Sequence, residues 1–406
     1  GSGGNYGLWL EGVDGAYSNI TISNTTQSSL LIAGNSNPLT WLDASIILNS
    51  SPSPWTIRTI FPVSIGSLGT ADLGYTAGIG LVTNYLQLNN VIANTVLVAD
   101  PLNTGGAGPA SVWRVNSDVT IPAGVTLTIN DGAIVKFDLA RILNVSGTLN
   151  IVDIIPGGAK AVLTSTRDES IGADADPTNS TLPAAGNWSR IELLTGSSIN
   201  IDNAIVRYTQ WGIRQSFSAV TSFSISNSEF REFNQYGMDL TTTNNALYTL
   251  NNVIVANANP GVNNSDGIRI ANSGLRNITV DFDNVTVDTV GDSLDDSGIE
   301  IAITASSTLT GRFDNVTVRN TFGTGFRLEN TTGGLVNPIF SGLDITNPGV
   351  GRYGLRLIGN NDGQTQPQVT GIAADGVTVV TNLIGDATAG SGGNYGLWLE
   401  GVDGAY

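Results

Sequence analysis

Two short motifs return along this chain at intervals too short for separate domains. The first has Asn or Gly at its second position, followed by alternating apolar residues. Its copies in the second half of the chain begin 24, 25, 32, 31, 27 and 34 residues apart. Recurrence at this length is typical of a solenoid, in which each repeat packs only on its neighbours. The copies are SNITI (18–22), DNAIV (202–206), SNSEF (226–230), NNVIV (251–255), DNVTV (283–287), DNVTV (314–318), SGLDI (341–345) and DGVTV (375–379).

The second motif follows the first and begins with Gly. Its apolar residues stand two apart, which is the pattern of a strand with one face toward the core. We therefore expect two strands and their turns in every repeat. The copies are GIRQ, GMDL, GIRI, GIEI, GFRL, GLRL and GLWL, starting at Gly212, Gly237, Gly267, Gly298, Gly325, Gly354 and Gly396.

The second position of the first motif is expected to form a left-handed bend between strands. Asn and Gly share a tolerance of positive φ, and the position holds no other residue type. Gly342 and Gly376 occupy it in the last two copies. We predict a structural turn column of Asn19, Asn203, Asn227, Asn252, Asn284 and Asn315.

A charged column is expected on the outer side of the second motif. The residue between its two apolar positions faces out by alternation, and stacked repeats place such residues about 4.8 Å apart. Opposite charges then mostly become neighbours, which predicts an exposed ladder of ion pairs. A sugar-binding stripe of Arg and Trp, including Trp398, is the alternative interpretation. The ladder residues are Arg214, Asp239, Arg269, Glu300, Arg327 and Arg356.

The chain divides into four segments by the regularity of its pattern. Residues 1–110 are less regular repeats, and residues 111–166 alternate apolar strands with short PAG, NDG and SG turns. Residues 167–187 have lost all periodicity, which predicts a long, polar, solvated loop. Residues 188–406 carry the regular repeats described above.

A much longer period is superimposed on the short one. Residues 390–406 repeat residues 1–17 letter for letter, GSGGNYGLWLEGVDGAY, which gives a period of 389 residues. The distance from Gly376 to the next projected turn-column Asn is 32 residues, within the range of the other repeats. We find no sequence typical of a capping helix at either end. The expected fold is therefore uncapped and continuous from one 389-residue module to the next.

Composition removes several classes of function. The chain has no Cys and no His, so it cannot form a Ser/His/Asp triad, a thiol nucleophile, a zinc site of thiolate or imidazole, or a disulfide. Its net charge of −17 argues against nucleic acid as a partner. No apolar run is long enough to span a membrane. Gly, Asn, Thr, Ser and β-branched residues favour strands and tight turns throughout.

The pattern resembles right-handed parallel β-helix proteins of the pectate-lyase-like type. The stretches DVTIPAGVTLTINDGAIVKF (118–137) and LNVSGTLNI (143–151) are similar to surface-protein segments of that group, as are LTSTRDESIGADADP (163–177) and GNWSRI (186–191). The resemblance implies an all-β, right-handed parallel β-helix solenoid. The fold hosts lyases, hydrolases, tailspikes, adhesins and passive stalks, so the resemblance alone does not choose a function.

The enzymes of that group imply motifs that this chain lacks. Asp295 and Asp296 are the only adjacent Asp pair, and paired carboxylates can act as acid and base across a sugar bond. The histidine and Arg/Lys motifs that accompany such a pair are missing. We therefore assign no catalytic, cofactor-binding or metal-binding residue and expect no enzyme activity.

Calcium is the one cofactor that the acidic residues leave open. Oxygen ligands at alternate positions suit this ion, but no full loop motif is present. A solvated loop explains the first of the two clusters, and the repeated turn explains part of the second. The clusters are Asp174, Asp176 and Asn179, and Asp281, Asp283, Asp288 and Asp292.

Sequons for N-glycosylation are frequent, and those in the less regular stretches are the better candidates. Chance occurrence in an Asn- and Thr-rich chain is the competing explanation. The candidates are Asn24, Asn179, Asn263 and Asn330.

These features together predict a structural, non-catalytic module of a long extracellular fibre, stalk or adhesin shaft at the cell surface. Its expected partners are identical modules end to end, with lateral self-association and surface glycans as further candidates. The alternatives are a polysaccharide-processing β-helix enzyme, either a lyase or a hydrolase, and a glycan-binding surface protein.

Overall fold

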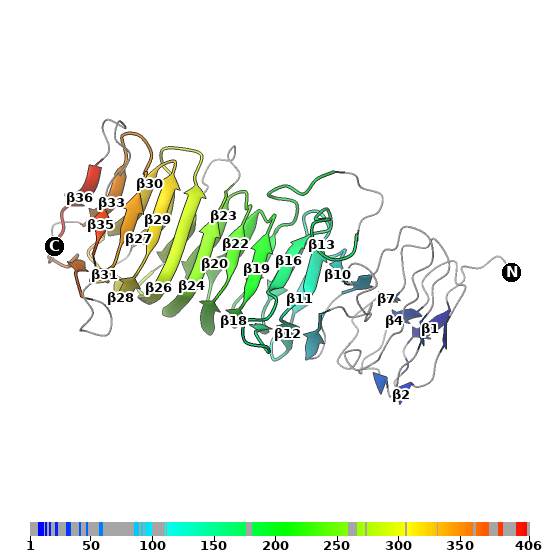
Figure 1. The fold of residues 1–406 in the computed structure, drawn as a ribbon. Coiled ribbons are helices and arrows are strands. Elements are labelled where there is room, and N and C mark those ends of the chain that lie inside the picture. Colours follow the sequence, from blue (N-terminus) through cyan, green and yellow to red (C-terminus); the bar gives the residue numbers. More distant parts are fainter. Residues whose placement is uncertain are drawn as a thin grey trace. The chain divides into compact units, whose positions relative to one another are not determined.

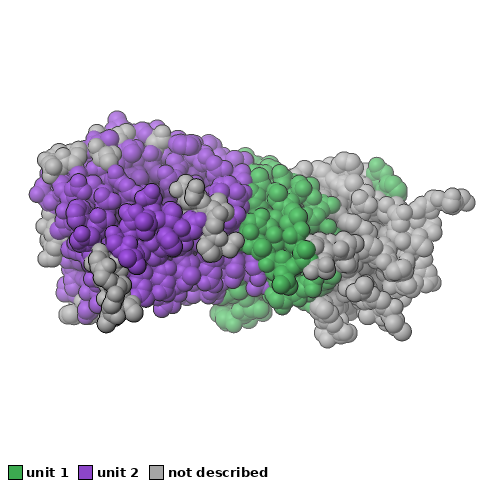
Figure 2. Space-filling view, turned by 90° about the horizontal axis from the view of Figure 1, so that it is seen from above, with its two compact units in different colours: residues 1–189, 203–205 green, residues 190–202, 206–406 purple. Residues whose placement is uncertain are grey.

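The structure of the chain is a computed structural model. It describes residues 112–175, 181–258 and 266–403, apart from residues 273, 305–306, 331, 360–362, 373–380 and 385–394. Before residue 112 it describes only short segments, and of most of these only the backbone. The chain forms two compact units, residues 1–189 with 203–205 and residues 190–202 with 206–406, coloured green and purple in Figure 2.

Every regular element in the described part of the chain is a β-strand, and the strand pairs described are parallel (Figure 1). The fold is thus all-β and solenoid-like, as the period-two pattern predicts. Parallel pairing follows from the repeats, because each turn of the chain returns to its starting ladder in the same direction.

The first unit contains three parallel ladders in which each strand pairs with the strand three places later. The chain therefore makes three strands per turn (Figure 1). The first ladder runs through β10 (Val112–Val115), β13 (Ile134–Phe137) and β16 (Ala161–Ser165), the second through β9 (Thr95–Leu97), β12 (Thr126–Asn130) and β15 (Thr148–Val152), and the third through β11 (Val119–Ile121) and β14 (Ile142–Val145).

Shorter strands precede these in the first unit. β1 (Leu8–Glu11) pairs with β4 (Leu30–Ala33), β4 with β7 (Ile57–Thr59), and β7 with β8 (Tyr85–Gln87), which pairs with β10. β2 (Ala16–Tyr17) pairs with β5 (Thr40–Trp41), and β3 (Thr21–Ile22) with β6 (Ile46–Ile47).

The second unit has the same construction with longer strands. One ladder begins with β17 (Arg190–Leu193) and then contains the second motif in each turn: β20 (Trp211–Ser218), β23 (Tyr236–Thr242), β25 (Ile268–Asn272), β27 (Ser297–Ile303), β30 (Thr324–Asn330), β33 (Tyr353–Ile358) and β36 (Tyr395–Glu400). A second runs through β18 (Ser198–Asp202), β21 (Ser222–Ser226), β24 (Ala246–Ala256), β26 (Asn277–Val290), β28 (Thr308–Asp314), β31 (Ile339–Ser341) and β34 (Gln368–Thr370).

The third ladder of this unit shares the long strands β24 and β26, which continue across the bend of the first motif. It includes β22 (Glu229–Arg231), β29 (Thr317–Thr321), β32 (Asp344–Thr346) and β35 (Leu383–Ile384). β19 (Ala204–Arg207) carries the first motif at the start of the regular repeats.

The core is built from rows of apolar side chains that stack from one turn to the next. Ile268, Ile299, Phe326 and Leu355 occupy consecutive paired positions, and all are fully buried. Rings stack in the same way, with centroids of Phe313 and Phe340 5.0 Å apart. Since burial of an aliphatic side chain contributes about 1.5–3 kcal/mol, these rows are the main stabilising term.

The Gly that begins the second motif is required by close packing between turns. A Cβ on Gly267 would lie 2.4 Å from Val287 Cγ1 and 2.5 Å from the carbonyl oxygen of Gly298 in the next turn. A Cβ on Gly298 would meet the carbonyl of Gly325 in the same way, at 2.7 Å. The repeated Gly thus lets successive turns approach at a strand edge, which explains why the motif always starts with this residue.

The long loop before Arg190 is not solvated along its first half, so the expectation for residues 167–187 is wrong there. Its described residues, 167–175 and 181–187, contain no strand, but Ala173 and Ala175 are buried against Val112 and Ile134. The fully buried Lys136 donates from Nζ to the carbonyl oxygens of Asp168 at 2.6 Å and Ala173 at 2.8 Å. The residue types of the loop do not indicate this contact, because Lys136 bonds to backbone carbonyl oxygens, which every residue has.

Candidate functional site

The turn column has the left-handed backbone conformation at every described member. Asn19 lies outside the described residues. Positive φ costs an ordinary residue about 1–2 kcal/mol, and Asn and Gly tolerate it best. The φ values are 62° at Asn203, 49° at Asn227, 53° at Asn252, 54° at Asn284, 53° at Asn315 and 66° at Gly342.

The amide side chains of this column bond from turn to turn. Asn252 Nδ2 donates to Asn227 Oδ1 at 2.8 Å, and Asn284 Nδ2 donates to Asn252 Oδ1 at 3.0 Å. Asn315 Nδ2 donates instead to Asp283 Oδ1 at 3.1 Å. Each bond joins residues of neighbouring turns, so the column links successive turns along the stack.

A second left-handed column lies five residues after the first and was missed by the sequence analysis. Asn320 Nδ2 donates to Asp288 Oδ1 at 2.8 Å, and Asn347 Nδ2 donates to Asn320 Oδ1 at 3.0 Å. The constant offset was the available signal, but the residue types differ too much to form a recognisable motif. The members are Tyr208, Glu232, Asn257, Thr289, Asn320 and Asn347, with φ between 48° and 63°.

The charged column is in register from turn to turn, but its residues are half-buried rather than exposed. Arg269 pairs with Asp239 at 3.0 Å and Glu300 at 3.4 Å, and Arg327 pairs with Glu300 at 3.2 Å. The side chains of Asp239 and Glu300 are only 14% and 18% exposed. The alternating apolar pattern correctly predicted that these residues lie on the outer face of the strands. The residues of the turns on either side shield them from water. The Cα partners continue from Arg214 through Asp239, Arg269, Glu300, Arg327 and Arg356 to Trp398.

Because of their partial burial, these pairs are screened less than isolated surface pairs, whose contribution is about 0–1 kcal/mol. Burial alone would lower the pKa of Arg269, but the carboxylates of Asp239 and Glu300 outweigh it and raise that pKa. The charged form of Arg269 is therefore held firmly in the column.

A buried carboxyl group lies beside the charged column. Asp266 is 5% exposed, and its Oδ1 accepts the backbone N–H of Ser297 at 2.5 Å. Burial raises its pKa well above the usual value, and the nearby charges of Glu300 and Asp296 raise it further, against the opposing effects of the Ser297 bond and Arg269. At 5% exposure this carboxyl group has little contact with solvent.

The Asp pair considered for catalysis does not form a matched site. Asp296 is 2% exposed, and its Oδ2 accepts the backbone N–H groups of Asp292 and Ser293 at 2.7 and 2.8 Å. Asp295 projects into solvent, with its side chain 91% exposed, and lies 3.7 Å from Arg352. One carboxylate organises its own loop while the other is in water, so the two do not face a common substrate.

Two members of the second acidic cluster considered for calcium accept hydrogen bonds within the protein. Asp283 accepts from Asn251 and Asn315, and Asp288 accepts from Asn320 and Arg319. In the part of the chain that the structure describes, no three acidic side chains gather as metal ligands.

The remaining members of these clusters are scattered or undescribed. Asp281 is the Cα partner of Arg312. Asp174 is half-buried in the anchored part of the loop. Asp176 and Asn179 lie outside the described residues.

Asn330 is a buried structural residue, so its proposal as a glycosylation site is wrong. Its exposure is 0%, and its Nδ2 donates to the carbonyl of Gly334 at 2.7 Å and to Thr365 Oγ1 at 2.8 Å. A glycan there would require the turn to open. Asn24, Asn179 and Asn263 lie outside the described residues.

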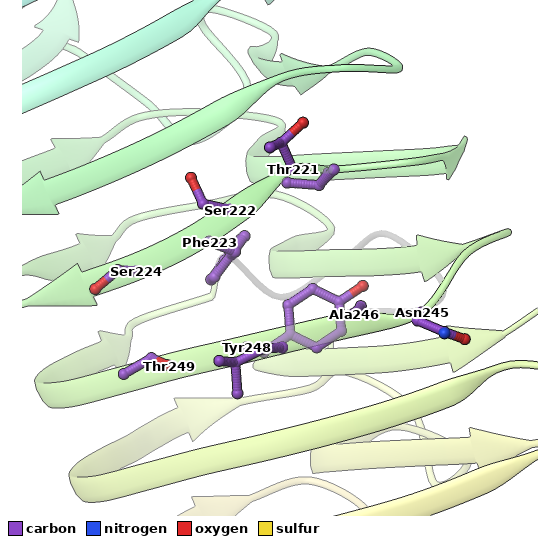
Figure 3. Close-up of a pocket in the computed structure, with 10 residues that line it drawn as sticks. Thr221, Ser222, Phe223, Ser224, Asn245, Ala246, Tyr248 and Thr249 are labelled. Carbon is purple, nitrogen blue, oxygen red and sulfur yellow. The ribbon is translucent and has the colours of Figure 1, made fainter.

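A small pocket opens between the starts of β21 and β24 (Figure 3). Its volume is about 250 Å³, and it is lined by residues 220–224 and 245–249. Phe223 and Tyr248 pack edge to face in its wall, with centroids 5.2 Å apart. The phenol of Tyr248 donates to Gln215 at 2.9 Å, and burial raises its pKa, so it remains protonated. The lining therefore supplies no acid–base group.

Aromatic side chains gather at the last turn of the second unit. The ring of Tyr353 lies 5.3 Å from that of Tyr395 and 5.1 Å from that of Trp398, and Arg356 lies over Tyr353 at 5.0 Å. Trp9, the counterpart of Trp398 in the repeated segment, is 53% exposed.

Comparison with protein-family models, curated proteins and solved structures gave no significant match for this chain. Among the residues with a described position, no helix is long and apolar enough to cross a membrane.

Proposed function

We propose that this chain is a structural, non-catalytic module of a long extracellular fibre, stalk or adhesin shaft at the cell surface. In this proposal the fold is a right-handed parallel β-helix that continues, uncapped, from each 389-residue module into the next. Its role is mechanical: a stack of hydrogen-bonded turns extends from the surface and presents its loops at regular intervals.

One observation carries the proposal. The two identical segments, residues 1–17 and 390–406, pair differently: the first pairs with a strand that follows it in the chain, and the second with a strand that precedes it. β1 pairs with β4, the strand that follows it, with Leu8 opposite Leu30. β36 pairs with β33, which precedes it, with Leu397 opposite Leu355. A single strand of this sequence therefore accepts a preceding and a following neighbour. That is the property required at a junction of tandem modules.

Bonds between turns further support a mechanical role. The amide columns and the charged column join each turn to the next through side chains, in addition to the backbone ladders. Bonds repeated along a stack make its stability a sum over neighbouring turns. Such a stack resists local opening better than backbone pairing alone.

A second candidate function, glycan binding, has one observation in its favour. Tyr353, Tyr395 and Trp398 form an aromatic group with Arg356 beside it, and aromatic faces and cationic side chains are suited to sugar rings. Titration with a broad glycan panel, followed by tryptophan fluorescence, tests it. No change for any glycan would remove this candidate.

The mass of the natural chain under denaturing conditions tests the principal proposal. Tandem modules predict a mass that is a large multiple of the 42.2 kDa of these 406 residues. A mass near that of a single module would overturn the covalent shaft. Length measured by electron microscopy provides the second readout, because a continuous stack gains about 4.8 Å per turn.

A further inference from the structure

Deepening the proposed function, on which this inference rests, we infer that residues 30–33 of each following module pair directly with β36 of the module before it. The predicted register sets Leu397 opposite the following module's Leu30, and Glu400 opposite its Ala33. It follows from the period of 389, which makes Leu397 the counterpart of Leu8, and from the observed pairing of Leu8–Glu11 with Leu30–Ala33.

The exposure of the apolar residues of β36 supports a missing neighbour of this kind. Leu397 and Leu399 are 41% and 42% exposed, although their partners Leu355 and Leu357 on β33 are fully buried. Leu10 is the counterpart of Leu399 in the repeated segment. It pairs with β4 and is only 7% exposed. The same residue is thus buried where the strand 30–33 is present and open where it is absent.

Backbone geometry identifies the edge that would receive this strand. Tyr395 donates its N–H to the carbonyl of Arg352, so this residue faces β33. Alternation along a parallel strand directs the N–H of Leu397 to the same side and those of Gly396 and Trp398 to the opposite side. The Trp398 N–H therefore points to the edge where the next module is placed.

The experiment uses the full chain and a two-module chain, in which Tyr406 is followed by a second copy of residues 18–389. Amide hydrogen exchange is measured at single residues in both. The inference predicts that exchange at Trp398 slows by at least about tenfold in the two-module chain. The amide of Leu397 is the internal control, because β33 protects it in both chains.

Cysteine pairs then identify the partner, since the natural chain contains no cysteine. Glu400→Cys is combined with Ala33→Cys in the second copy, or, as the matched control, with Leu31→Cys in the second copy. Only the first pair stands in the predicted register, at about the 5 Å Cα separation that a disulfide needs. Leu31 lies on the same face two residues away, so it should form the disulfide poorly.

The outcomes separate the inference from the proposed function. Slower exchange at Trp398 together with a disulfide from Ala33→Cys supports the pairing. Equal exchange in the two chains, or preferential bonding of Leu31→Cys, overturns it. If the natural chain nevertheless has the mass of many modules, the shaft proposal stands and only this pairing falls. A natural mass of one module would instead remove the proposed function itself.

Discussion

Leu355 and Leu397 occupy paired positions on neighbouring strands, yet Leu355 is fully buried and Leu397 is 41% exposed. The difference arises from the number of turns that cover each residue. β33 lies between β30 and β36, whereas Leu397 has β33 on one side. A core of this kind is completed by each added turn, which makes the stability of a turn depend on its neighbours.

Replacements of Asn252 should separate backbone strain from the amide ladder. Asn252→Ala is expected to lower the free energy of unfolding by about 1–2 kcal/mol, because φ is 53° there. Asn252→Gly also loses the bonds to Asn227 and Asn284 but removes the strain, so its cost should be clearly smaller. Chemical denaturation measures both. Equal losses would show that the side-chain bonds, and not the backbone, decide the residue type.

Lys136→Met should release the anchored part of the long loop. Two backbone carbonyls lose their donor in a buried site, and each unsatisfied group costs about 1–3 kcal/mol. We expect lower stability together with faster tryptic cleavage after Arg167. Lys160→Met, at the only other lysine of the chain, is the matched control and should change neither readout appreciably. Unchanged cleavage in Lys136→Met would contradict the anchoring role.

Asp266 should make the protein less stable as the pH rises. Its pKa is raised in the folded state, so between about 3.9, the unfolded value, and the folded value the native protein binds the proton more tightly. The free energy of unfolding therefore falls through this window. Asp266→Asn keeps an acceptor for the Ser297 N–H and cannot ionise. Its stability relative to the natural protein should increase from pH 4 to pH 7, as denaturation at several pH values would reveal. A constant difference across this range would refute the assignment.

Arg269→Gln should leave two half-buried carboxylates without their shared cation. We expect a loss of about 1–2 kcal/mol, larger than for an ordinary surface pair. Arg319→Gln is the matched control, because Arg319 pairs with Asp288 but its side chain is 50% exposed. The double variant Arg269→Gln/Asp239→Asn should recover part of the loss. Thermal denaturation at low and high salt compares the variants, and equal effects at the two arginines would argue against partial burial as the cause.

The strand positions and the first left-handed column were predictable because the residues that fix them have few substitutes. Gly is required at positions such as 267 and 298 because the neighbouring turn leaves no space for a Cβ atom. Asn is favoured at positions such as 227 and 252 because the backbone there has positive φ. The Asn conformation is local, and the close contact at Gly is repeated from turn to turn, so each cause leaves the same residue type in successive repeats. The period of the sequence therefore predicted an all-strand, parallel arrangement with the second motif in a single ladder.

The features that were missed depend on neighbours in space. Glu232 and Thr289 have the same left-handed conformation as Asn320. Glu and Thr have no intrinsic preference for positive φ, so contacts with neighbouring turns must impose this conformation. Alternation placed Asp239 on the outer face but could not give its shielding by the adjacent turns. The burial of Asn330 had the same origin, because its partner Thr365 lies in the next turn.

The sharpest prediction concerns Leu397 in chains of different length. Leu397→Ser should cost the 406-residue chain little, because the side chain is already 41% exposed. In a chain that continues into a second module, the added turn is expected to bury Leu397 as Leu355 is buried. The same substitution should then cost about 2–4 kcal/mol, similar to Leu355→Ser in either chain. Urea denaturation of the four variants measures these differences. An equal, small cost of Leu397→Ser in both chains would mean that no turn packs on β36, and the junction between modules would then be open.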